Sequence, residues 1–141
     1  MKNTEINIGM DKLYYSSYFF LIASLYALYN KLYLCSILIF YLFITSVVHW
    51  KDYNNKFKLC GDHYMIFIFC FYTIFISFKI KNYICLISLG LLFILYRISN
   101  HYRIKNNYLV DSNIWILTHT VVSVSMIYIL NKIRLYYYKN N

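Results

Sequence analysis

The chain has 141 residues, of which 61% are hydrophobic and only 13% are charged. Soluble domains carry about 25% charged residues, and a globule of this size has too little interior for so many apolar side chains. The net charge is +9, but the cations stand in small groups between apolar blocks, as they do beside membrane spans. This composition excludes a soluble domain, and the dispersed cations argue against nucleic-acid binding, which needs a clustered basic surface.

Five apolar blocks follow one another, at about 13–29, 32–50, 63–78, 83–97 and 112–130, each bounded by Lys, Arg, Asn or Asp. The blocks are continuously apolar and do not alternate with period two, so they predict helices and not barrel strands. The chain contains no proline, so we expect unkinked helices. The predicted fold is a single all-α domain, a polytopic transmembrane bundle of about five helices.

The first block contains Ala23 and Ala27, a small-xxx-small pair that would let this helix pack closely on another. The tyrosines of LYYSSY near its start, and of YYY at 136–138 after the last block, are typical of aromatic belts at the membrane interfaces. A specific aromatic ligand site is the alternative.

The second block ends in TSVVHW. Thr45 and His49 are four residues apart and Ser46 and His49 three, so all three side chains can line one helix face. A histidine at membrane depth is costly and normally faces the bundle interior. The segment is therefore either an ordinary interfacial helix end, with Trp50 as its anchor, or part of a metal or catalytic site.

Further polar residues meet the same membrane side if the chain crosses five times. They are Asp62 and His63 at the start of the third block, His101 in the following loop, and Asp111 and Ser112 at the start of the fifth. His119 follows Ser112 by seven residues, about 10 Å deeper on the same stripe. The pattern indicates a shared site, although Asp62, Asp111 or Ser112 could instead cap their helices.

Three stretches, TSVVHW, LCGDHYMIFIF and WILTHTVVS, resemble the membrane hydrolase superfamily of alkaline ceramidases, adiponectin and progestin receptors and myomaker-like proteins. That family has SxxxH in its second helix, an Asp at the start of the third and HxxxH in the last, and it binds zinc through three histidines. The resemblance implies that His49 and His119 bind zinc and that Asp62 holds or activates the metal-bound water. It also implies that Ser46 or Thr45 polarises a lipid amide or ester.

The chain departs from this family pattern in three ways. Thr45 replaces the family serine, with Ser46 beside it. Ser123 stands where the second histidine of HxxxH would be, which removes one zinc ligand, and His63 or His101 could replace it. Five helices are predicted where the family has seven.

Two function classes follow. The first is a divergent zinc-dependent lipid amide or ester hydrolase, with Ser46 and Asp62 catalytic and His49 and His119 as metal ligands. The alternative is a non-catalytic membrane scaffold or assembly protein, such as a viral envelope or organelle component, whose polar residues only pack helices. A channel or transporter is disfavoured because the sequence has no proline, only three glycines and no buried charge at mid-membrane.

The expected surroundings are the lipid bilayer and a lipid substrate, with no nucleic-acid partner. Short apolar blocks favour the endoplasmic reticulum or another thin internal membrane. Lysines and arginines number eight on the side of the N-terminus and six on the other, a bias toward a cytoplasmic N-terminus.

Overall fold

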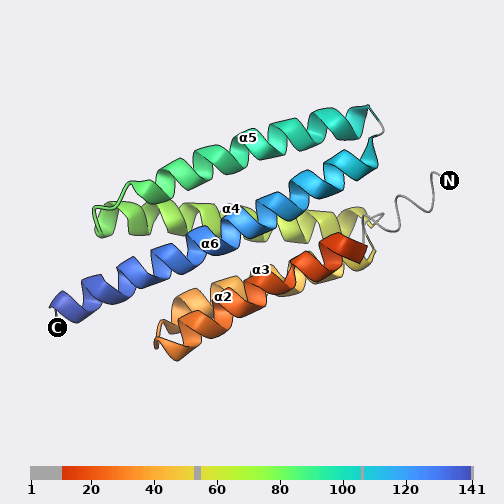
Figure 1. Ribbon diagram of the computed structural model, residues 1–141. Helices are drawn as coiled ribbons and strands as arrows, with labels where there is room; N and C mark the ends of the chain where they lie inside the picture. Colours follow the sequence, from red (N-terminus) through yellow and green to blue (C-terminus); the bar gives the residue numbers. More distant parts are fainter. Residues whose placement is uncertain (1–10, 53–54, 106, 141) are drawn as a thin grey trace.

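The computed structural model describes residues 11–52, 55–105 and 107–140, which form helices and turns with no strand among them. Figure 1 shows five helices running up and down beside one another: α2 (Tyr18–Tyr29), α3 (Tyr33–Lys51), α4 (Lys56–Lys79), α5 (Ile84–Ile104) and α6 (Tyr108–Asn140). Residues 11–16 are also helical and lead into α2 through a turn at Ser17. The prediction of an all-α bundle of about five helices is confirmed.

Among the residues that the structure describes, three helices are long and apolar enough to cross a membrane. They are α3, α4 and the part Leu109–Lys139 of α6. Their outer faces expose large apolar side chains such as Phe40, Phe71 and Val124, which suit a lipid environment and not water. These helices have the character of membrane spans.

The helices pack in a closed ring. Each contacts the next in sequence, and α6 packs back on α2. The shared core holds Phe20, Ala23 and Ala27 of α2, Ile39 and Leu42 of α3, Ile76 of α4, and Met126, Ile129 and Ile133 of α6. Ala23 and Ala27 are fully buried, so the small-xxx-small pair lies in a helix interface, as predicted.

The bundle has two distinct ends (Figure 1). At one end α2, α4 and α6 begin while α3 and α5 finish; it contains His49 and Asp62, and we call it the histidine end. The opposite end holds the α2–α3 turn, the α4–α5 turn and the last turns of α6. We call it the lysine end, after Lys31 and Lys81 in those turns.

The start of α4 differs from its predicted block, which begins at 63. The side-chain oxygen of Asn55 accepts hydrogen bonds from the backbone N–H groups of Phe57 at 3.0 Å and Lys58 at 3.4 Å. This cap stabilises a helix start at Lys56. Asp62 therefore lies in the second turn of α4 and does not cap it.

The last two helices also run past their predicted blocks. α5 continues to Ile104 and α6 extends over Tyr108–Asn140. His101, predicted in a loop, thus lies in the last turn of α5, where it is exposed. The tyrosines at 136–138 belong to α6 and do not follow it.

Two tight turns at the lysine end share one backbone pattern. In the α2–α3 turn, the backbone N–H of Leu32 donates to the carbonyl of Ala27, and that of Lys31 donates to the carbonyl of Leu28. In the α4–α5 turn, the N–H of Asn82 donates to the carbonyl of Ser77, and that of Lys81 donates to the carbonyl of Phe78. These are Schellman motifs, which usually hold glycine in the left-handed conformation. Here lysine takes that place, with φ of 59° at Lys31 and 52° at Lys81.

Candidate functional site

Many polar side chains are buried at the histidine end. They include Ser16, Ser17, Ser46, His49, Asp62, Ser99, Asp111, Ser112 and His119. Burying a polar group without a hydrogen bond costs free energy, and more so where no water is available. The partners of these side chains therefore decide what this end of the bundle can do.

His119 of α6 is held by Ser16, from the segment that leads into α2. The Oγ of Ser16 lies 2.7 Å from Nδ1 of His119, and both residues are buried. The hydroxyl of Ser16 also lies 2.9 Å from the carbonyl of Leu13. The donor in the contact with His119 depends on the tautomer of the imidazole, because the same hydroxyl proton can point to Leu13 or to Nδ1. The contact fixes the orientation of the ring.

His49, in the last turn of α3, is 4% exposed. Its Nδ1 is buried and has no hydrogen-bond partner among the described residues. Its ring packs on Trp50 at 4.5 Å between centroids, and Trp50 packs on Trp115 at 5.8 Å and on His119 at 6.3 Å. These four side chains form one aromatic cluster that joins α3 to α6.

Further buried polar atoms at or near this cluster have no partner in the described part of the chain. They are Nε1 of Trp50, Nε1 of Trp115 and Oγ of Ser123, which lies one turn beyond His119 on α6. Most buried polar atoms in proteins are hydrogen-bonded. Several unpaired atoms near one another are therefore a feature that a bound water, ion or ligand would explain.

Thr45 and Ser46, adjacent on α3, contact different neighbours. Thr45 donates a hydrogen bond of 3.3 Å to the carboxylate of Asp62 on α4, which is 6% exposed. The hydroxyl of Ser46 lies 3.0 Å from that of Ser17. The two candidate residues Ser46 and Asp62 are thus each bonded to a different part of the bundle.

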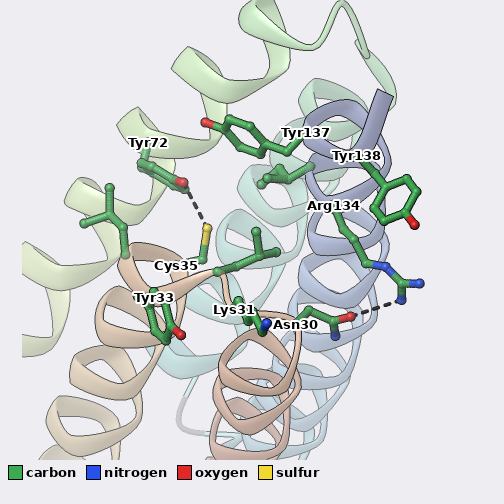
Figure 2. A pocket seen from close by; sticks show the side chains of 11 residues that line it. Asn30, Lys31, Tyr33, Cys35, Tyr72, Arg134, Tyr137 and Tyr138 are labelled. Carbon is green, nitrogen blue, oxygen red and sulfur yellow. Dashed lines mark hydrogen bonds between the residues drawn. The ribbon is translucent and has the colours of Figure 1, made fainter. Parts of the chain in front are cut away.

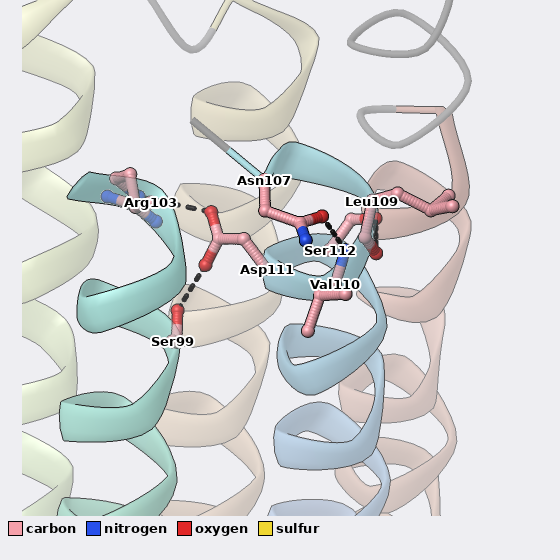
Figure 3. Close-up of polar contacts among 7 residues, drawn as sticks. All are labelled: Ser99, Arg103, Asn107, Leu109, Val110, Asp111 and Ser112. Carbon is pink, nitrogen blue, oxygen red and sulfur yellow. Dashed lines mark hydrogen bonds and ion pairs between the residues drawn. The ribbon is translucent and has the colours of Figure 1, made fainter. Parts of the chain in front are cut away.

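Asp111 links α6 to α5, as Figure 3 shows. Its carboxylate accepts a short hydrogen bond from Ser99 and one of 3.1 Å from Nε of Arg103. At the start of α6, the side chain of Asn107 accepts from the N–H of Val110 at 3.3 Å. Asp111 therefore acts as an interhelical partner, and the capping role expected for it is carried by Asn107.

The predicted zinc-site residues are not gathered into one group among the described residues. No group of three or more His, Cys, Asp or Glu side chains within 11–52, 55–105 and 107–140 could hold a metal ion. His49 and His119 share the aromatic cluster through Trp50, whereas Asp62 contacts Thr45. Of the three predicted zinc-site residues, the two histidines are the pair that the cluster joins.

Ser16, Ser17 and Trp115 were not predicted as site residues. The serines stand in LYYSSY, which indicated only an aromatic belt. A usable signal was present, because Ser16, Ala23 and Ala27 lie on one stripe of spacing seven and four. Trp115 precedes His119 by four residues, so it shares the face of that histidine.

Comparisons of the chain with models of protein families, with characterised proteins and with solved structures find no match. The resemblance to membrane hydrolases therefore stays a hypothesis.

Proposed function

We propose that this chain is a multi-pass membrane protein whose histidine end is a divergent zinc-dependent site for cleaving lipid amides or esters. The observation that supports the proposal is the hydrogen bonding of Nδ1 in the two buried imidazoles. His49 has a buried Nδ1 without a partner among the described residues, and His119 is held through Nδ1 by Ser16. Metal-binding histidines are commonly held in this way through the ring nitrogen that does not bind the metal.

Each residue has a role in this proposal. Nδ1 of His49 and Nε2 of His119 hold the metal. Zinc, when bound, supplies a Lewis acid and a water of lowered pKa. Asp62, held by Thr45, is the buried carboxylate that accepts a proton, and Ser46 donates a hydrogen bond to the substrate oxygen.

Metal analysis of the purified chain tests this proposal. We expect zinc in the unaltered protein and its loss in the double variant His49→Ala with His119→Ala. His101→Ala is the matched control, because this histidine is exposed in the last turn of α5. Unaltered protein without zinc, or equal zinc content in the double variant, would contradict the metal role.

A non-catalytic scaffold is the second candidate, supported by a different observation. Hydrogen bonds join successive parts of the ring, from Ser17 to Ser46, from Thr45 to Asp62 and from Ser99 to Asp111. Such bonds stabilise membrane bundles by roughly 0.6–2 kcal/mol each. For a scaffold we expect substitutions that remove these hydrogen bonds to lower the unfolding temperature. The unaltered protein should then contain no zinc and cleave no lipid.

The membrane that holds the chain is a separate proposal. The short apolar blocks support the endoplasmic reticulum or another thin internal membrane. Helices α4, with 24 residues, and α6, with 33, are longer than their apolar blocks, but only the apolar part of a helix has to match the bilayer core. Microscopy of the tagged chain beside a marker of the endoplasmic reticulum tests the location directly.

A further inference from the structure

A cleft of about 680 Å³ opens at the lysine end, far from the histidines. Figure 2 shows its main side chains, Asn30, Lys31, Cys35, Tyr72, Arg134 and Tyr137, which come from the α2–α3 turn, α3, α4 and α6. Part of its wall is fixed by a 3.0 Å contact between the hydroxyl of Tyr72 and the sulfur of Cys35. The cleft is therefore formed by four elements of the ring.

Two cations line this cleft. Arg134 donates a hydrogen bond of 3.0 Å to the side-chain oxygen of Asn30, a neutral partner that leaves its charge uncompensated. Lys31 occupies the left-handed position of the α2–α3 turn, which costs a residue with a Cβ about 1–2 kcal/mol relative to glycine. A lysine thus stands where glycine would favour the fold, beside an arginine without a carboxylate partner.

The whole lysine end is positive without counter-charge among the described residues. Its cations are Lys31, Lys79, Lys81, Lys132, Arg134 and Lys139. The described carboxylates are Asp11 in the segment before α2, Asp52 directly after α3, Asp62 in the second turn of α4 and Asp111 in the first turn of α6, so they lie toward the histidine end. At the histidine end, Asp52 pairs with Lys58 and Asp111 pairs with Arg103. The cations of the lysine end have no such carboxylate partner among the described residues, so a negative charge from outside would neutralise them.

Tyrosine hydroxyls complete the polar lining. Lys79 donates a hydrogen bond of 3.3 Å to the hydroxyl of Tyr137, and its ammonium lies 5.5 Å from that ring centre. Leu34, also on the cleft wall, is 61% exposed. The site thus combines cations and hydroxyls with an apolar border at the end of apolar helices. A lipid matches this combination, because its headgroup is polar and its acyl chains are apolar.

We propose that this cleft binds the phosphate headgroup of an acidic membrane phospholipid. Lys31 and Arg134 pair with the phosphate, tyrosine hydroxyls donate to its oxygens, and the acyl chains lie on the exposed apolar faces beside the cleft. Basic pockets between membrane helices are known to take such headgroups. The site is distinct from the histidine end, so it does not depend on the zinc proposal.

Binding of short-chain lipids to the full chain in dodecyl maltoside tests the proposal. Dioctanoyl phosphatidylglycerol is the probe, with dioctanoyl phosphatidylcholine and inorganic phosphate as comparisons. We expect phosphatidylglycerol alone to bind and to raise the unfolding temperature. Lys31→Gly and Arg134→Gln should each weaken binding about fivefold, since each removes one cation from the site.

Lys81→Gly is the matched control, because it makes the same change in the same backbone motif outside the cleft. We expect unchanged binding in this variant. Lys31→Gly should unfold at the same or a higher temperature without lipid, so weaker binding would not reflect misfolding. Equal binding of phosphatidylcholine, an equal shift with inorganic phosphate, or equal effects of Lys31→Gly and Lys81→Gly would each overturn the proposal.

Discussion

Ser16 has one hydroxyl proton and two acceptors within reach, the carbonyl of Leu13 at 2.9 Å and Nδ1 of His119 at 2.7 Å. Which of them receives the proton depends on the tautomer of His119. In the tautomer that zinc binding through Nε2 requires, Nδ1 carries a proton and donates to Ser16, and Ser16 donates to Leu13. The chemistry available to His119 depends on a side chain 103 residues away in sequence.

The Ser16→Ala variant should be destabilised by about 1–3 kcal/mol, because it leaves Nδ1 of His119 buried without a partner. If His119 binds zinc, the variant should also lose roughly 10- to 100-fold in metal affinity. Thermal unfolding in detergent and zinc titration measure the two effects. Ser88→Ala is the control, since that hydroxyl is exposed on α5; an equal loss there would show that the Ser16 contact has no special role.

The Ser123→His variant tests the residue that departs from HxxxH. It places a second imidazole one turn from His119, and we expect tighter zinc binding, by at least about tenfold if the ring acts as a third ligand. Ser123→Ala is the control. It removes a buried hydroxyl that has no partner in the described structure, so it should leave stability nearly unchanged. Zinc affinity that is the same in both variants would contradict the ligand assignment.

At the scale of single helices, α4 shows why the predicted boundaries were short. The stretch KFKLCGDHY contains enough polar residues to look like a loop, because hydropathy marks the apolar part of a helix and not its first turn. The helix starts at Lys56 because Asn55 caps it. For the same reason α5 was ended before His101, although its backbone continues to Ile104.

The placement of the polar residues was more predictable than these boundaries. His49, Asp62 and His119 were expected toward one end from the number of helices alone, and an error of a few residues does not change the direction of a helix. Their individual contacts could not be predicted. Ser16 meets His119 only because α6 packs on α2; the stripe of Ser16, Ala23 and Ala27 indicates a packing face but not which helix fills it.

The cap of α4 gives a prediction for an element. Asn55→Ala should cost about 1 kcal/mol of stability, because two backbone N–H groups lose their acceptor. The unfolding temperature of the variant in detergent measures this loss. Asn113→Ala changes the same residue type at an exposed position within α6 and should have little effect. A similar decrease in both variants would argue against the cap.

The lysine turns give a second prediction at this scale. Lys81→Gly should raise stability by up to about 1 kcal/mol, because glycine avoids the steric cost of a Cβ in the left-handed conformation but loses more backbone entropy on folding. Lys81→Ala removes the charge but keeps the Cβ, so it should not stabilise. Unfolding temperatures of the two variants separate backbone conformation from charge, and stabilisation by alanine alone would contradict this account.

At the scale of the molecule, the helices alternate in direction, so α2 begins at one end of the bundle and α6 finishes at the other (Figure 1). If all five helices cross the bilayer, tags at the two chain ends should lie on opposite membrane sides. Protease protection in sealed vesicles measures this, and the cation count favours a cytoplasmic N-terminal tag. Equal protection of both tags would contradict an odd number of crossings.

The closure of the ring by α6 on α2 has a consequence for biosynthesis. The ribosome releases α2 before α6, so the face of α2 that carries Ala23 and Ala27 lacks its α6 neighbour until residues 108–140 have been made. Ser16 likewise lacks its contact with His119 until α6 has been made. A chain that stops before residue 108 keeps these surfaces open to other membrane helices, so the ring closes only once α6 has been made.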